Sequence, residues 1–244
     1  MSLAVRGQAD PLPVRDPAMT EVAPGVWQIT GFPAHAINAY LVGDVLFDAG
    51  TRWARKRFLK LLRGRPLSMV ALTHCHPDHQ GSARAICEAF NVPLACHPAD
   101  APAVEGRAAM VPRNLPIRLS TFFWAGPPCK VDRLLKEGDV VAGFQVLHAP
   151  GHTPGHVVFF RESDRVLVAG DVLANLNYLT GRPGLREPPA FFSADPEQNR
   201  QSIRAVLALK PAVLCFGHGP PLRSVVDLER LVDALPQPLA LGAT

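Results

Sequence analysis

The sequence lacks the features of a membrane-spanning or secreted chain. No apolar run reaches the roughly 18 residues that a spanning helix needs. The first 20 residues contain no apolar segment typical of a secretory signal, and we expect residues 1–20 to form a flexible, proline-containing lead-in. The five cysteines include no CxxC pair and no zinc-knuckle spacing, as is usual in a reducing compartment. We therefore expect a cytoplasmic protein with no membrane partner.

The charge pattern argues against a nucleic-acid partner. The chain has 25 basic and 21 acidic residues, and the basic ones read as scattered, without the stripe that would follow a phosphate backbone. A sequence pI near 9.0 gives only a slight preference for anionic ligands. We expect a small-molecule substrate and no nucleic acid, while the oligomeric state stays unknown.

The composition is that of one folded domain. Hydrophobic residues make up 48% of the 244 positions and charged residues 19%, which is enough to build a core and too little charge for disorder. Chains of this length routinely form a single domain in layered folds. We expect residues 21–244 to be that domain.

The order of short apolar runs predicts an α/β fold in two similar halves. The first half has strand-like runs from Val26, then a helix in RWARKRFLKLLRG with Trp53, Phe58, Leu61 and Leu62 on one face. The second half has the strand-like runs VVAGFQVLHA, HVVFF, RVLVAG and AVLCF. Asp195 before Pro196 predicts the start of a helix between the last two of these runs.

Two proline-containing stretches read as irregular. Residues 101–130 carry the aromatic run Phe122, Phe123 and Trp124, and residues 173–193 carry further aromatic and basic side chains. These aromatics either complete the core under long loops or line a substrate pocket, and the sequence leaves both open. The candidates for substrate contact are Tyr178, Arg182 and Arg186.

One short loop concentrates metal-binding side chains. In THCHPDH, which follows the buried run SMVALT, three histidines and one aspartate lie between His74 and His79. Side chains alternate along an extended chain, so His74 and His76 can share one ion while Asp78 and His79 face a second. So many polar groups beside a buried strand would be costly to bury unpaired, and a bound cation would satisfy them. Imidazoles with carboxylates suit zinc, and also iron or manganese.

Three further residues follow apolar runs in the second half. They are His152 in PGHTPGH, Asp171 in VLVAGDV and His218 in CFGHGP. Together with HxHxDH, these motifs resemble those of the metallo-β-lactamase superfamily of binuclear metallohydrolases, over roughly Pro24 to Pro221.

The resemblance implies a fold and a set of ligands. The fold is a four-layered αβ/βα sandwich of two packed mixed β-sheets with helices outside and two metal ions at one edge. Asp171 would bridge both ions, and Asp48 would accept a hydrogen bond from a ligand imidazole. The first ion would be held by His74, His76 and His152, and the second by Asp78, His79 and His218.

This site predicts a metal-dependent, most simply dizinc, hydrolase. A hydroxide bridging two cations would attack the carbonyl of an ester, thioester or lactone-type bond, and Asp78 would orient it and relay its proton. The alternative is an iron-dependent oxidoreductase of the same fold, either persulfide dioxygenase-like or diiron. The complete set of ligand residues favours the hydrolase.

Overall fold

The structure is a computed structural model that describes residues 19–31, 33–178, 180–223 and 225–236. Of the expected lead-in, residues 1–18 lie outside the described residues. Met19 and Thr20 already belong to the first strand, β1.

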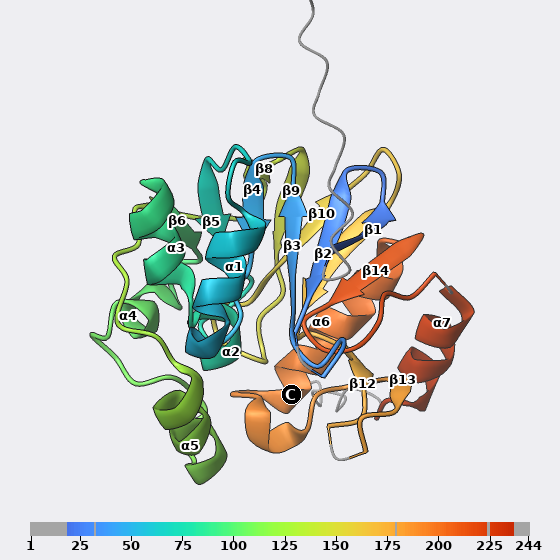
Figure 1. Cartoon of the computed structure of the whole chain (residues 1–244). Helices are drawn as coiled ribbons and strands as arrows, with labels where there is room; N and C mark the ends of the chain where they lie inside the picture. Colours follow the sequence, from blue (N-terminus) through green and yellow to red (C-terminus); the bar gives the residue numbers. More distant parts are fainter. Residues whose placement is uncertain (1–18, 32, 179, 224, 237–244) are drawn as a thin grey trace, which may run out of the picture.

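Two β-sheets pack face to face in the middle of the molecule (Figure 1). The first has seven strands in chain order, which are β1 (Met19–Ala23), β2 (Val26–Thr30), β3 (Asn38–Val42), β4 (Val45–Phe47), β5 (Met69–Ala71), β6 (Leu94–Cys96) and β7 (Arg133–Leu134). The second has the order β14-β11-β10-β9-β8, formed by β8 (Val140–Val141), β9 (Phe144–His148), β10 (Val157–Arg161), β11 (Val166–Gly170) and β14 (Val213–Phe216). A small hairpin joins β12 (Ala174–Leu176) to β13 (Pro183–Arg186).

Helices cover both outer faces of this pair of sheets. Over the first sheet lie α1 (Arg55–Leu61), α2 (Pro77–Gln80) and α3 (Ala83–Phe90), and over the second lie α6 (Pro196–Ala208) and α7 (Val225–Ala234). Helix α5 (Leu115–Trp124) contacts α2, and α4 (Ala101–Val104) packs on the core beside the first sheet. Helix, sheet, sheet and helix make four layers, so the expected αβ/βα sandwich is confirmed.

Alternation along the strands explains why both sheets are buried on both faces. Leu46 packs under α1 and α3, whereas its neighbour Phe47 points between the sheets. In the second sheet Phe159 points inward and Phe160 points toward α6. The rings of Phe47 and Phe159 stack across the two sheets with centroids 4.2 Å apart. Side chains with a period of two residues therefore fill three layers of core at once.

Several local expectations need correction. VVAGFQVLHA forms two strands, because Ala142 and Gly143 both have positive φ and turn the chain between β8 and β9. Trp53 does not share the buried face of α1, since it lies in a short 3₁₀ turn before the helix and is exposed. The start of α6 is confirmed, with the Asp195 side chain accepting the Gln198 N–H at 2.9 Å.

The stretch 101–130 contains more regular structure than expected. It holds α4 and α5, and α5 begins where Asn114 Oδ1 accepts the Ile117 N–H at 3.1 Å. Stretch 173–193 likewise contains the β12–β13 hairpin. Pro102 and Pro116 stand in the first turns of α4 and α5, and Pro183 begins β13, where a missing N–H costs little.

Candidate metal centre

The candidate ligands all follow the carboxyl ends of strands at one edge of the sandwich. The loop after β5 leads into α2 and carries the HxHxDH residues, and the loop after β9 carries His152. Asp171 directly follows β11, and His218 follows β14, which runs parallel to β11. Parallel strands end at the same edge, so these side chains from distant parts of the chain meet there.

The structure brings the seven predicted ligands together in overlapping groups. Ligand atoms within each group lie within 4.8 Å of one another, and the first group is His74, His76 and His152. The others are His74 with His79 and Asp171, and Asp78 with His79 and His218.

Asp171 lies between the two halves of the cluster. Its carboxylate oxygens are 3.0 Å from His218 Nε2, 3.4 Å from His79 Nε2 and 3.7 Å from His152 Nε2. Asp78 approaches the same imidazole of His218, with 3.2 Å between Oδ2 and Nε2. A carboxylate in this position can contribute oxygen to two ions.

Unsatisfied buried atoms test whether a metal suits the site. The Nε2 atoms of His74, His79 and His152 and Oδ1 of Asp171 are buried and have no hydrogen-bond partner. Leaving a buried polar atom unpaired costs about 1–3 kcal/mol, and here several such atoms point at one another. Divalent cations would satisfy these lone pairs, so the donors present suit a metal pair.

The outward-facing nitrogens of the histidines are held by the protein. His79 Nδ1 lies 2.9 Å from Asp48 Oδ2, where the sequence placed a carboxylate partner for a ligand imidazole. His76 Nε2 donates to the Val111 carbonyl at 2.8 Å, which leaves its Nδ1 lone pair for the site. The other outward contacts are His74 Nδ1 to Thr73 Oγ1, His152 Nδ1 to Ser193 Oγ, and His218 Nδ1 to the Ala36 carbonyl.

The charges of the cluster divide it in two. Burial lowers the pKa of His74 and of His152 well below the usual value, so both imidazoles are neutral and offer lone pairs. Burial also opposes a charge on His79 and His218, but the carboxylates around them outweigh it. They hold the pKa of His79 well above its usual value and raise that of His218 to about 10. A cation entering this second half must therefore displace protons.

Asp100 joins the two ligand loops and was not predicted. It is buried and accepts hydrogen bonds from Cys75 N at 2.9 Å, Thr153 Oγ1 at 2.7 Å and Gly155 N at 2.8 Å. Cys75 lies between two candidate ligands of the first loop, and the other two donors follow His152 in the second. In the sequence its only distinguishing feature is its place soon after the strand LAC, so nothing there linked it to the site.

Close backbone approaches explain the glycines of the last motif. A Cβ on Gly217 would lie 2.1 Å from Asp171 Oδ1 and 2.5 Å from His79 Cε1. Only glycine fits at this position beside the ligands. Two further histidines hold the segment around His152: His156 Nε2 accepts the Asp171 N–H at 3.0 Å, and His148 Nε2 contacts the Pro154 carbonyl at 2.9 Å.

A cavity of about 270 Å³ opens beside the cluster. His76, Asp78, His152, Asp171 and His218 form its polar side, and the rest is mostly apolar. The remaining lining residues are Pro33, Ala36, Ile37, Pro77, Ile117, Ser120, Trp124, Leu176, Tyr178 and Phe192.

The substrate-pocket candidates divide between the cavity and the surface. Tyr178 lines the cavity, with its ring 5.0 Å from that of His218. Neither Arg182 nor Arg186 is among the described residues that line it, although Leu176 and Tyr178 of the same hairpin do, and Arg182 is exposed. Phe122 and Phe123 are neither core nor cavity residues, since both are largely exposed.

Comparisons with known proteins agree with this geometry. Residues 33–218 match the family model of the metallo-beta-lactamase superfamily. The chain is 32% identical to a protein of Bacillus subtilis (strain 168) named as the probable metallo-hydrolase YflN, over 91% of this chain and 95% of that protein. It is 28% identical to the uncharacterized protein YobT of the same organism, over 86% and 94%.

Solved structures show the same likeness. The crystal structure of TTHA1623 in a di-iron-bound form aligns with a TM-score of 0.63 and 33% identity, covering 85% of this chain and 99% of that one. TTHA1429 of Thermus thermophilus, a metallo-beta-lactamase family protein, aligns with a TM-score of 0.65 and 23% identity over 87% and 80%, which speaks for the fold alone. The chain belongs to the metallo-β-lactamase superfamily, as its motifs predicted.

Proposed function

We propose that this protein is a metal-dependent hydrolase that cleaves an ester, thioester or lactone-type bond of a small molecule. The observation that carries the proposal is the set of buried, unpartnered Nε2 and carboxylate atoms that converge from separate strand ends. The ligands are proposed to be His74, His76, Asp78, His79, His152, Asp171 and His218. Membership of a family named for metal-dependent hydrolysis supports the same reading.

The chemistry combines the bound ions with a carboxylate at the cavity wall. Two divalent cations, with zinc as the preferred metal, would act as Lewis acids: they would polarise the substrate carbonyl and lower the pKa of bound water. Asp78 lines the cavity and accepts the proton of the attacking water as a general base. His218 Nε2 lies 3.2 Å from Asp78 Oδ2, so both side chains are placed to hold the same ion. Asp48 fixes the orientation of His79 from behind.

The cavity narrows the class of substrate. Arg and Lys are absent from its lining among the described residues, so no fixed cation there is placed to bind a substrate carboxylate. Ile117, Trp124 and Phe192 instead offer an apolar wall, and a volume of about 270 Å³ admits only a compact group. Burial raises the pKa of Tyr178 well above its usual value, so its hydroxyl stays protonated and can donate to a substrate oxygen. We therefore propose a small, uncharged acyl group next to the scissile bond.

A substrate screen tests the proposal. Zinc-loaded protein is assayed with an aryl ester, a thioester, a γ-lactone, a β-lactam and a phosphodiester, alongside Asp78→Asn and the surface control Asp132→Asn. We expect turnover of at least one of the carbonyl substrates. Asp78→Asn should lower kcat about 10²–10⁴-fold, because it removes both the general base and a proposed ligand of the second ion. Turnover of the phosphodiester alone, or full activity of Asp78→Asn, would contradict the proposal.

The second candidate is an iron-dependent oxidoreductase, persulfide dioxygenase-like or diiron. It is favoured by one observation, the di-iron-bound form of the similar protein TTHA1623. Metal analysis and the absorption spectrum of freshly purified protein separate the two. Colourless protein with zinc and no oxygen uptake fits hydrolysis, whereas coloured iron protein that consumes oxygen with a persulfide fits the second candidate.

A further inference from the structure

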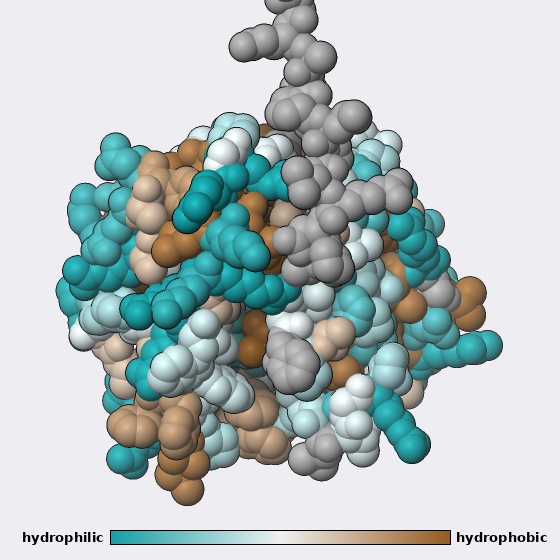
Figure 2. Space-filling view, in the orientation of Figure 1, coloured by the Kyte–Doolittle hydropathy of each residue, from teal (hydrophilic) through white to brown (hydrophobic). Residues whose placement is uncertain are grey.

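Basic residues gather around helix α1 and are not scattered as expected. Seven of the chain's 25 Lys and Arg residues lie between Arg52 and Arg65, and this segment contains no Asp or Glu. The net charge of the whole chain is only +4, so this one segment accounts for more than the entire excess. Figure 2 shows the hydrophilic side chains gathered over α1 on the face toward the viewer.

Helix α5 exposes an apolar face next to this segment. Leu115, Leu119, Phe122 and Phe123 repeat at the spacing of one helix face, and all four are exposed, Phe122 by 70% and Leu115 by 64%. The opposite side of α5 lines the cavity of the metal centre through Ile117. A helix that is apolar on its solvent side as well indicates a surface that something else covers.

The two features form one continuous surface. Trp53, 70% exposed at the start of the α1 segment, donates its indole N–H to the carbonyl of Phe123 on α5 at 2.8 Å. The guanidinium of Arg52 lies 4.6 Å from the centre of the Trp53 ring. In Figure 2 the brown patch at α5 lies below the hydrophilic side chains over α1, with paler side chains between them. We call this surface, formed by Arg52, Trp53, Arg55, Lys56, Leu115, Arg118, Leu119, Phe122 and Phe123, the α1–α5 face.

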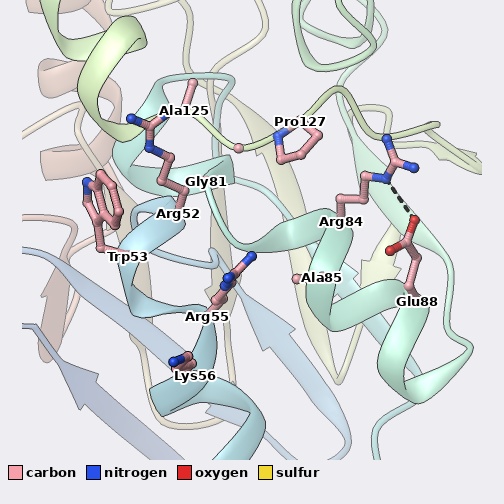
Figure 3. A pocket seen from close by; sticks show the side chains of 11 residues that line it. Arg52, Trp53, Arg55, Lys56, Gly81, Arg84, Ala85, Glu88, Ala125 and Pro127 are labelled. Atoms are coloured by element: carbon pink, nitrogen blue, oxygen red, sulfur yellow. Dashed lines mark hydrogen bonds and ion pairs between the residues drawn. The ribbon is translucent and has the colours of Figure 1, made fainter.

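A basic pocket opens on the α1–α5 face. It has a volume of about 970 Å³ and lies between α1, α3 and residues 125–127. Figure 3 shows Arg52 and Arg55 on the α1 side and Arg84 on the α3 side, where Arg84 binds Glu88 at 2.7 Å. Among the described residues, Glu88 is the only acid lining this pocket, and its charge is matched by Arg84. Arg52, Arg55 and Lys56 thus remain as an excess of positive charge around a space that can take an anionic head group.

We propose that the α1–α5 face docks on the surface of an anionic lipid bilayer. Exposed Leu, Phe and Trp side chains enter the boundary between head groups and acyl chains, and nearby Arg and Lys side chains bind anionic head groups. The face provides both, and acids are missing from 52–65 and from 108–129, which includes all of α5. The expectation of no membrane partner rested on the absence of a spanning run. A peripheral contact needs none, and none of the described helices is long and apolar enough to span a membrane.

Charge also distinguishes a bilayer from the other occupants of such a face. A second copy of the chain would place the same cations opposite themselves, because a symmetric interface uses one patch twice. The nine residues of the α1–α5 face include no acid, and Glu88 in the pocket is already paired with Arg84, so that contact would be repulsive. A nucleic acid would satisfy Arg55 and Lys56 but would leave Leu115 and Leu119 against a charged backbone.

Vesicle binding by the full chain tests the proposal. Partition is measured by flotation with vesicles of phosphatidylcholine alone and with about one-third phosphatidylglycerol, at low salt and at about 0.5 M salt. We expect binding only to the anionic vesicles, weakened by salt. Arg55→Gln with Lys56→Gln should weaken it about 25-fold, about fivefold per cation removed. Phe122→Ser with Phe123→Ser should weaken it about 100-fold.

Matched controls make the result decisive. Val140→Ser with Leu134→Ser removes two apolar side chains that are exposed to a similar degree but lie on β8 and β7, outside the α1–α5 face. Arg133→Gln with Lys136→Gln removes two cations from that same region. Both controls should bind like the wild type, and melting curves confirm that every variant is folded. Equal binding to neutral vesicles, no binding to anionic ones, or a loss in the controls as large as in the test variants overturns the proposal.

Discussion

The Asp100→Asn substitution probes how the two ligand loops are held together. The Asp100 carboxylate accepts hydrogen bonds from Cys75 N, Thr153 Oγ1 and Gly155 N, at 2.9, 2.7 and 2.8 Å. Asparagine has the same size but offers one oxygen and one NH₂ group. At least one of these buried donors would then face another donor, while the fold around it keeps its shape.

The expected magnitude follows from these contacts. Loss of a hydrogen bond to a charged acceptor costs about 1.5–3 kcal/mol, and a buried donor left unsatisfied costs about 1–3 kcal/mol. We expect the free energy of unfolding of the zinc-loaded protein to fall by about 3 kcal/mol. The zinc dissociation constant should rise about 10–100-fold, because the substitution loosens both loops that carry candidate ligands.

Urea unfolding and zinc competition with a chelator measure the two quantities. The matched control is Asp132→Asn, where an exposed aspartate pairs with Lys130 on the surface. Such a pair contributes at most about 1 kcal/mol, so this variant should lie close to the wild type and bind zinc normally. If Asp100→Asn unfolds and binds zinc like Asp132→Asn, Asp100 does not join the loops in the way argued above.

Three further predictions concern the same centre. Gly217→Ala should abolish tight binding of a second metal ion in a zinc titration, because its Cβ would lie 2.1 Å from Asp171 Oδ1. The control Gly25→Ala, whose Cβ would have nothing within 4 Å, should lower stability but bind as much zinc as the wild type. Burial lowers the pKa of His156 to about 3, so the unfolded chain takes up its proton near pH 6.5 before the folded chain does. The free energy of unfolding should therefore fall as pH decreases from about 6.5 toward 3, by up to about 1.4 kcal/mol per pH unit. When this free energy is measured by urea unfolding at several pH values, it should depend less on pH in His156→Gln than in the wild type. Removing metal with a chelator should lower Tm, and zinc should restore it, because the Nε2 atoms of the cluster otherwise stay unpaired; an unchanged Tm would count against the centre.

Local patterns were enough to predict much of the candidate site. The density of histidines in one loop and the glycines beside His152, Asp171 and His218 identify residues that need no structure to be suspected. The role of Asp48 was implied by the resemblance to the superfamily, and Asp48 contacts His79. Asp100 and the Val111 carbonyl could not be found in this way. Each acts through hydrogen bonds to residues 25 to 55 positions away, which no local spacing encodes.

The cavity and the α1–α5 face show a second limit of prediction from the sequence, which is the direction in which neighbouring side chains point. The prolines in 101–130 suggested a loop, although Asn114 and Pro116 are also signals of a helix start. Once α5 forms, Trp124 lies in the cavity wall while Phe122, only two residues earlier, lies in solvent. The helical turn alone decides this difference, so the run Phe-Phe-Trp could not be assigned as a unit.

The sequence by itself determined the family, the strand pattern and the residues able to bind metal, because those depend on residue type and on short spacings. Only the tertiary structure decided which nitrogen of each histidine faces inward, which carboxylate holds which loop, and that Arg182 and Arg186 stay outside the cavity. These outcomes depend on how the sheet from the first half of the chain packs against the sheet from the second half, because the core between the two sheets fixes where the loops of both meet.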